Sequence, residues 1–180
     1  MHRSAHTPSP RFVTGLTLLL AFGLAALWPG ASLGAQEVLS AEHRAIDFLI
    51  GEWRTTSEFP DGRVGEGELE YRWVLGGSWM RVEFTGEHPD ALPWEAHVMQ
   101  RWNPSTDAYE AWVFGGDADP LRFRGVLLAD GHFRVEYSPE EGVVTGIDYH
   151  RMVDGTVLQE NWMEDAGGRW LTLQTSYRPR

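Results

Sequence analysis

The stretch Phe48-Leu49-Ile50-Gly51-Glu52-Trp53 decides the fold, because it joins a short helix to the first of a long series of short strands. Ser40 is a suitable N-cap, so the sequence predicts a helix from this residue to about residue 50. Gly51 allows the chain to turn into the first strand. Trp53 is then expected to lie buried across the closed end of the structure that the strands build.

Short β-rich runs separated by turn residues fill the rest of the chain. Turn signals such as Pro60-Asp61-Gly62, Gly76-Gly77 and Asp130-Gly131 recur about every eight to twelve residues. The predicted strands cover 52–59, 66–75, 78–87, 94–102, 107–115, 121–129, 132–138, 143–153, 156–164 and 169–178. Short, evenly spaced strands favour an antiparallel meander, which closes most economically into an up-and-down barrel. The predicted fold class is therefore an all-β barrel, with a two-sheet sandwich as the alternative.

Hairpin register predicts which side chains point inward, because a two-residue turn determines which residues face each other. Across Gly76-Gly77, the inward face carries Leu69, Tyr71, Trp73, Met80, Val82 and Phe84. Across Asp154-Gly155, one face carries Ile147, Tyr149, Leu158 and Trp162, and the last strand continues it with Leu171, Leu173, Thr175 and Tyr177.

Two arginines on a predicted inward face suggest a ligand site. The predicted register of the sixth and seventh strands puts Arg122 and Arg124 on the face that carries Tyr137. A buried guanidinium needs a carboxylate, so these side chains are expected to hold the anionic end of a ligand. The alternatives are an internal pair between arginine and Glu160, which is expected near Tyr149, or arginines that reach solvent at the barrel mouth.

The strands predicted over 94–102 and 107–115 have two plausible inward faces. One carries Trp94, Ala96, Val98, Gln100, Tyr109, Ala111 and Val113, and it is favoured as core because it is more apolar. The other would bring His97, Glu110 and Trp112 into the cavity, where His97 and Glu110 could act as an acid–base pair.

Composition disfavours several classes of function. Removing the two arginines of the first 35 residues leaves 15 − 2 = 13 basic against 26 acidic residues, which disfavours nucleic acid and anionic membranes as partners. Gly-x-Ser-x-Gly, His-Glu-x-x-His and phosphate-loop motifs are absent, and the histidines lack metal-ligand spacing. No metal and no cofactor is therefore expected. Cysteine is also absent, so packing alone must stabilise the fold.

The first 35 residues have the order of an export signal. Arg3 and Arg11 precede an apolar run over 12–28, and Leu33-Gly34-Ala35 provides small residues before Gln36. The expected organisation is a signal peptide over 1–35 and a barrel domain over 36–180, in a periplasmic or secreted protein that leaves the membrane after cleavage. The alternative is an uncleaved anchor, for which the apolar run is marginal against a bilayer core of about 30 Å.

Several segments carry a family resemblance: 48–53, Leu75-Gly76-Gly77-Ser78-Trp79, the run from Trp102-Asn103-Pro104 to Trp112, and the ending Ser176-Tyr177-Arg178. They are similar to a bacterial lipocalin-like (calycin-type) family known as domain of unknown function 1579. The resemblance implies a calycin-type barrel and no settled activity. Nitrobindin-like barrels of related architecture bind haem through a histidine near the C-terminus, and the last strand here contains none, which argues against haem.

The sequence therefore predicts an exported barrel that binds a small apolar or amphipathic ligand, with or without a carboxylate. The expected ligand-binding residues are Arg122, Arg124, Tyr137, Tyr149, Glu160, His97 and Trp112. The first alternative is an enzyme that uses the same cavity, with His97 and Glu110 as proton-transfer groups. The second is a closed barrel that serves only as an interaction module.

Overall fold

The computed structural model describes residues 39–90, 93–115, 119–139 and 142–180. The export signal predicted over 1–35 lies outside these residues and stays a prediction. Within the described part of the chain, no helix is both long and apolar enough to cross a membrane.

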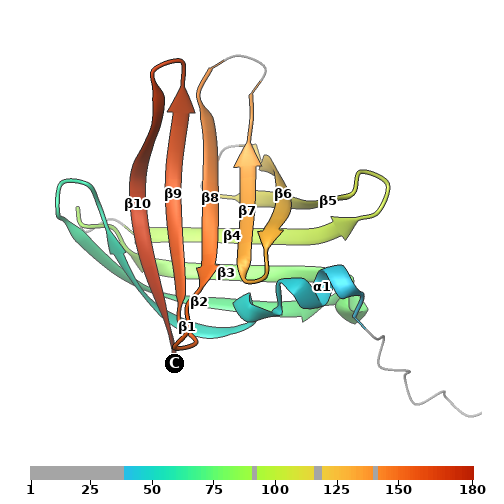
Figure 1. Cartoon of the computed structure of the whole chain (residues 1–180). Helices are drawn as coiled ribbons and strands as arrows, with labels where there is room; N and C mark the ends of the chain where they lie inside the picture. Colours follow the sequence, from blue (N-terminus) through green and yellow to red (C-terminus); the bar gives the residue numbers. More distant parts are fainter. Residues whose placement is uncertain (1–38, 91–92, 116–118, 140–141) are drawn as a thin grey trace, which may run out of the picture. The chain divides into compact units, whose positions relative to one another are not determined.

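Ten antiparallel strands close into one barrel, with short helical segments before β1 and between β2 and β3. The elements in chain order are α1 (Ala41–Ala45), η1 (Asp47–Leu49), β1 (Gly51–Glu58), β2 (Val64–Val74), η2 (Leu75–Gly77), β3 (Trp79–Glu87), β4 (Pro93–Asn103), β5 (Ala108–Phe114), β6 (Leu121–Ala129), β7 (His132–Tyr137), β8 (Val144–Arg151), β9 (Val157–Asp165) and β10 (Gly168–Pro179). Each strand pairs with its sequence neighbours, and β10 pairs with β1 to complete the circle. The predicted barrel is confirmed, and the sandwich alternative is wrong. In Figure 1, β3 and β4 run across the view, β8 to β10 stand upright, and α1 lies across the lower end.

The segment before β1 is helical in two short pieces, α1 and η1, where the sequence predicted one helix to about residue 50. The Ser40 hydroxyl caps α1 by accepting a hydrogen bond from the His43 backbone N–H at 3.3 Å. Gly51 opens β1 with φ +143°, a conformation that other residues rarely adopt. Trp53 is 6% exposed, and its Nε1 donates to the Leu49 carbonyl oxygen at 2.9 Å. Trp53 is thus buried and joined to the helical segment, which confirms the expected role of this stretch.

The hairpin of β2 and β3 has the predicted register. Tyr71 faces Val82 and Leu69 faces Phe84, so this row of apolar side chains points into the barrel. The alternate row is charged and forms ion pairs on the outer surface, including Arg81 with Glu83 at 3.1 Å. The alternation of apolar and charged residues in the sequence therefore predicted correctly which face of this hairpin points into the barrel.

The register predicted for β6 against β7 is wrong. The two-residue turn forms, and Ala129 faces His132, but a β-bulge lies between Leu127 and Ala129. Beyond the bulge Arg124 faces Glu136, one residue away from the predicted pairing. Since a one-residue slip exchanges the two faces of a strand, Arg122 and Arg124 point outward, and Phe123 points inward.

The register predicted for β8 against β9 is also wrong. Arg151 faces Val157, so the connection is a five-residue turn over 152–156 instead of a two-residue turn. The Met152 N–H donates to the Thr156 carbonyl oxygen at 2.9 Å within this turn. The faces of β9 are therefore exchanged: Leu158, Glu160 and Trp162 point outward, whereas Val157, Gln159 and Asn161 point inward. The inward face predicted for β10 is correct for Leu173, Thr175 and Tyr177, and a bulge puts Leu171 on the outside.

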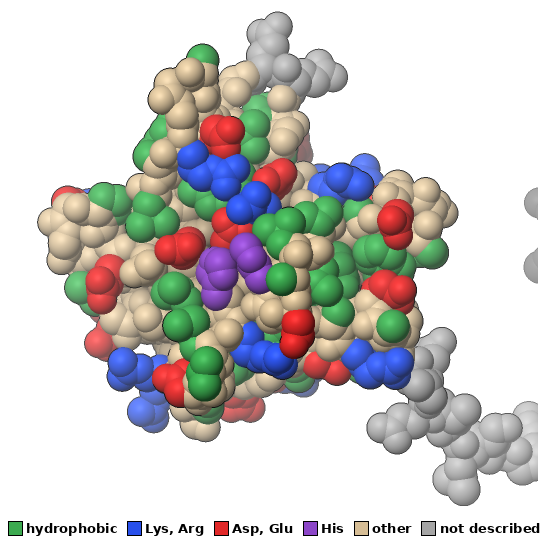
Figure 2. All heavy atoms as spheres, viewed as in Figure 1, with side chains coloured by type: hydrophobic (Ala, Val, Ile, Leu, Met, Phe, Trp, Pro, Cys, Tyr) green, Lys and Arg blue, Asp and Glu red, His purple; other side chains and the backbone are tan. Residues whose placement is uncertain are grey.

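The core divides into a packed end and an open interior. Ile46 and Leu49 of the helical segment pack with Trp53, Tyr109 and Phe133 in one buried cluster at the helix end. On the face that Figure 2 shows, acidic and arginine side chains lie around neighbouring histidines, among hydrophobic and other side chains. The ionised groups of the strands thus lie on the outside, and the side chains described next line the interior.

Candidate functional site

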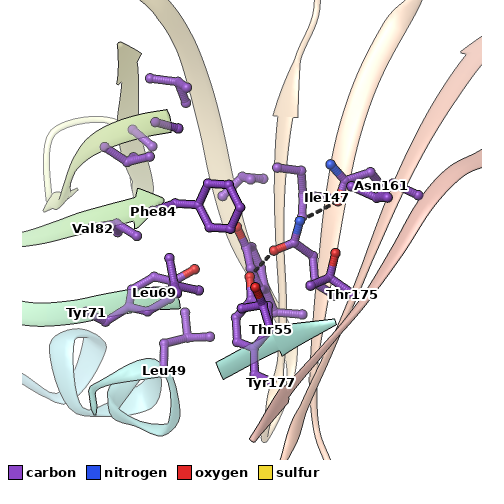
Figure 3. A pocket seen from close by; sticks show the side chains of 18 of the residues that line it. Leu49, Thr55, Leu69, Tyr71, Val82, Phe84, Ile147, Asn161, Thr175 and Tyr177 are labelled. Carbon is purple, nitrogen blue, oxygen red and sulfur yellow. Dashed lines mark hydrogen bonds between the residues drawn. The ribbon is translucent and has the colours of Figure 1, made fainter. Parts of the chain in front are cut away.

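The barrel encloses a cavity of about 250 Å³. All ten strands and η1 contribute side chains to its wall, and Figure 3 shows how these side chains converge from both sides. Typical small-molecule pockets have volumes of about 300–1,000 Å³, so this cavity suits a compact guest.

Small inward residues create the space. Ala96 and Ala111 line the cavity on β4 and β5, where larger side chains would fill it. A Cβ added to Gly67 would lie 2.7 Å from the Phe84 ring, and one added to Gly86 would lie 2.8 Å from it. These two glycines therefore let the ring lie close against the backbone of β2 and β3.

The wall has an apolar side and a polar side. Strands β3 to β7 contribute almost only apolar side chains, with Gln100 as the exception: Val82, Phe84, Trp94, Ala96, Val98, Ala111, Val113, Phe123 and Val135. The polar side chains come mainly from β1, β9 and β10: Thr55, Ser57, Gln159, Asn161, Thr175 and Tyr177. Tyr149 of β8 and Tyr71 of β2 flank this side. A guest in the cavity therefore meets hydrogen-bonding groups on one side and hydrocarbon on the other.

The polar side is held by hydrogen bonds between its own members. The Tyr177 hydroxyl donates to Gln159 Oε1, and Gln159 Nε2 donates to Asn161 Oδ1 at 2.5 Å. The Ser57 and Thr175 hydroxyls bond to each other across β1 and β10 at 2.9 Å. These contacts fix the orientation of the amides, which makes the polar side a preorganised surface.

Three phenols extend the polar side, and all stay neutral. Burial raises the pKa of Tyr71, Tyr149 and Tyr177 well above the ordinary tyrosine value, and charge repulsion among the three phenols adds to the effect. The phenols can therefore donate hydrogen bonds but supply no charge near neutral pH.

Two buried polar atoms of the wall have no hydrogen-bond partner among the described residues. They are Thr55 Oγ1 on β1 and Gln100 Nε2 on β4. A buried polar group without a partner costs about 1–3 kcal/mol, so such groups are rare in folded proteins.

Charged residues are missing from the wall formed by the described residues. The two arginines predicted to line the cavity lie on the outer surface instead. Arg122 donates to Glu110 Oε1 at 2.5 Å, and Arg124, which is exposed, lies opposite Glu110 in the β5–β6 pairing. The carboxylate that Arg122 needs is therefore supplied by the protein, on the outside of the barrel.

Glu110 is a buried carboxylate in this outer surface. Its side chain is 5% exposed and accepts hydrogen bonds from Arg101 at 3.1 Å and Asn103 at 2.9 Å, besides the one from Arg122. Burial raises the pKa of Glu110, but the hydrogen bonds from Asn103, Arg122 and Arg101 outweigh burial and leave the pKa below its ordinary value. Glu110 is thus an ionised structural anchor.

The remaining predicted site residues are scattered. His97 is on the outer face, 60% exposed, with Nδ1 3.8 Å from a Glu83 oxygen. Trp112 is also outside and packs on Trp79 with ring centroids 5.4 Å apart. Glu160 lies outside too, with Oε2 3.4 Å from His150 Nε2. The idea that His97 and Glu110 face the cavity as an acid–base pair is therefore wrong.

Two predicted residues do lie inside. Tyr149 lines the cavity, as expected. Tyr137 points inward beside the cavity and packs against Phe123, with ring centroids 5.8 Å apart. The favoured face of β4 and β5 is confirmed, because Trp94, Ala96, Val98, Gln100, Ala111 and Val113 all line the wall.

A second buried carboxylate lies on the outer face of β8. Asp148 accepts hydrogen bonds from Arg134 Nε at 2.6 Å and from Arg134 Nη2 at 2.9 Å. Trp162 Nε1 also donates to it at 3.0 Å, and the neighbouring His132 and His150 rings lie 4.2 Å apart. Despite these histidines, no group of three or more His, Cys, Asp or Glu side chains among the described residues is placed to hold a metal ion.

Sequence reasoning missed four polar residues of the wall: Thr55, Ser57, Gln159 and Asn161. One signal for part of it was available, because alternation from the buried Trp53 along β1 places Thr55 and Ser57 on the same inward face. Gln159 and Asn161 could not be recognised in this way, since their orientation depends on the length of the turn that precedes β9.

Comparison with known proteins supports the family resemblance. Residues 39–123 match the model of a family described as protein of unknown function (DUF1579). No curated protein matches the chain.

Two solved structures are reported as similar to the chain. One is EF1p2_mFAP2b bound to DFHBI, with 12% identity, 77% of this chain and 98% of that chain covered, and a TM-score of 0.42. The other is the S-type phycobiliprotein lyase CPES from Guillardia theta, with 8% identity, 81% of this chain and 95% of that chain covered, and a TM-score of 0.48.

Proposed function

We propose that this chain, which belongs to the DUF1579 family over residues 39–123, is a binding protein that holds a small, largely apolar molecule inside its barrel. The observation that carries the proposal is the cavity of about 250 Å³ with a mainly apolar wall and a preorganised polar side. Small-molecule sites are typically concave, mostly apolar and equipped with a few well-placed polar groups.

The size of the cavity adds an energetic argument. Protein interiors are normally close-packed, and a residual void costs about 24 cal/mol per Å³ in mutant proteins. A molecule that fills the space makes dispersion contacts with the apolar wall, and these contacts favour binding.

A cavity-filling substitution tests the proposal. N-phenyl-1-naphthylamine is an uncharged probe whose fluorescence rises in apolar surroundings, and we expect it to bind the wild-type protein. Ala111→Phe puts a phenyl ring into the cavity and should weaken probe binding at least about tenfold, while circular dichroism shows an intact β fold. Ala129→Phe makes the same change at an exposed position and should bind the probe as the wild type does. Equal binding by wild type and Ala111→Phe would show that the cavity is not the site.

The geometry does not support the enzymatic alternative, in which His97 and Glu110 transfer protons inside the cavity. His97 and Glu110 both lie outside the cavity, and Glu110 is fully engaged by Arg101, Asn103 and Arg122. The described cavity wall holds hydroxyl and amide groups but no histidine or carboxylate to transfer protons. Binding is therefore the function that the geometry supports best.

Export is the second part of the proposal. The basic, apolar and small-residue order of the first 35 residues supports an exported protein that begins near Gln36, in the periplasm or outside the cell. Mass spectrometry of the protein recovered from a secreting host should give a mature chain without 1–35. Recovery of exported protein that retains the apolar run over 12–28 would contradict cleavage.

A further inference from the structure

We propose that the ligand is uncharged: an apolar molecule with a hydroxyl, carbonyl or amide oxygen that lies against Asn161 on the polar side of the cavity. This inference rests on the proposed binding function and assigns the chemical class of the ligand. It departs from the carboxylate-bearing ligand that inward arginines would have selected.

The first support is the absence of a counter-charge. The described cavity wall contains no arginine, histidine, aspartate or glutamate side chain. Its most acidic groups are phenols, which burial keeps protonated. An ionic group that enters this space would give up its hydration and meet no opposite charge, which strongly disfavours binding.

The second support is the direction of the hydrogen-bond chain. Tyr177 donates to Gln159, and Gln159 donates to the Asn161 carbonyl oxygen Oδ1. The Asn161 amide oxygen accepts this bond, and its Nδ2 group remains as the donor at the end of the chain. Among the described residues, Nδ2 of Asn161 has no acceptor. The complementary ligand group is an acceptor oxygen.

The third support is the position of Asn161 at the border between polar and apolar surfaces. Asn161 faces Ile147 across β8 and β9, and Figure 3 shows the two side chains next to each other at the cavity wall. Phe84 lies across the cavity from them in the same view. A ligand with one polar oxygen at Asn161 can therefore extend its hydrocarbon part toward β3 to β5.

Three eight-carbon competitors that differ only in the end group test the ligand class at pH 7. Octanol is neutral, octanoate is anionic and octylammonium is cationic, and each competes against N-phenyl-1-naphthylamine. We expect octanol to displace the probe at a concentration at least about tenfold lower than either ion requires. Equal or tighter binding of octanoate would overturn the inference and leave the binding function standing. Failure of the uncharged probe itself to bind would count against the binding function.

Two substitutions locate the polar contact. Asn161→Leu removes the donor and should weaken octanol about twofold to tenfold, as expected for one neutral hydrogen bond, while the naphthylamine probe still binds. Asn161→Asp keeps the shape and adds a negative charge, so octylammonium should gain at least about tenfold relative to octanol. Gln174→Leu is the control, because Gln174 is an amide on the outer face of β10, bonded to Glu160. Unchanged octanol binding by a folded Asn161→Leu variant would place the polar contact elsewhere and refute the assignment.

Discussion

Asp148→Asn is expected to destabilise the barrel by about 3–5 kcal/mol, although Asp148 lies outside the cavity. The residue is 6% exposed and accepts two hydrogen bonds from Arg134 and one from Trp162. Asparagine has the same shape, but an NH₂ group replaces one accepting oxygen and the negative charge is lost. The Arg134 side chain is only 23% exposed, so its charge would be left partly buried without a partner.

Urea unfolding followed by circular dichroism measures this loss as a change in the free energy of unfolding. A thermal melt gives a second measure. For a domain of this size, 1 kcal/mol shifts the Tm by about 2–4 °C, so the Tm should fall by about 6–20 °C. Glu160→Gln is the matched control on the same outer face, because its side chain is 35% exposed and its contacts are weaker. Its effect should stay below about 1 kcal/mol. An equally small effect of Asp148→Asn would refute the reasoning and make the Arg134 pair an ordinary surface contact.

The same pair predicts how stability depends on pH. Burial raises the pKa of Asp148, but hydrogen bonding and charge attraction from Arg134, with smaller contributions from His132 and Trp162, outweigh it and leave the pKa below the ordinary 3.8. The folded state therefore binds this proton more weakly than the unfolded state, so the stabilisation is present above about pH 4 and is lost as the pH falls through and below that value. The Asp148→Asn variant should lose less stability than the wild type between about pH 5 and pH 3. Parallel pH profiles would contradict the lowered pKa.

Three further substitutions separate core, outer-face and surface roles. Trp53→Ala should cost about 3–5 kcal/mol in urea unfolding, because Trp53 is a large buried side chain, whereas a loss below about 1 kcal/mol would contradict its burial. Gly146→Ala should cost about 1–3 kcal/mol, since a Cβ there would lie 2.0 Å from the Trp162 ring, and its effect should not add to that of Asp148→Asn. Arg124→Leu should change the unfolding free energy by less than about 0.5 kcal/mol and leave probe binding unaltered, because Arg124 is exposed on the outer face. Weaker probe binding by this variant would instead support a role of Arg124 in ligand binding.

Local signals explain why the sequence predicted the architecture well. Turn residues mark the strand ends, and all ten predicted strands exist with boundaries that differ by at most two residues. The faces of β2 and β3 are also predictable, because charged and apolar residues alternate over 68–73 and 80–84 and the turn is short. The face of β4 and β5 follows from the more apolar choice, since Ala96, Val98 and Ala111 line the cavity.

The two register errors have a common physical cause. The run from Gly125 to Ala129 is apolar at every position, so neither register exposes a charge there, and nothing in the pattern reveals the bulge near Leu128. Likewise, Met152 and Val153 look like the end of a strand, although both are exposed in the turn that precedes β9. Where a strand ends in apolar residues, the sequence pattern does not show at which residue the strand pairing ends.

These errors do not affect the prediction of a cavity, but they change its wall. The predicted wall carried charged side chains, whereas the described wall carries neutral ones. Alternation is the rule on every strand, so a one-residue slip on one strand exchanges that strand's two rows without filling the barrel. On β6 the slip exchanges Arg124 for Phe123, and on β9 it exchanges Glu160 for Asn161 at the cavity wall. The first set would favour an ionic ligand, and the second would favour the neutral one that we propose. On this proposal, the bulge and the turn that set the register of β6 and β9 determine the ligand class, more than the overall composition does.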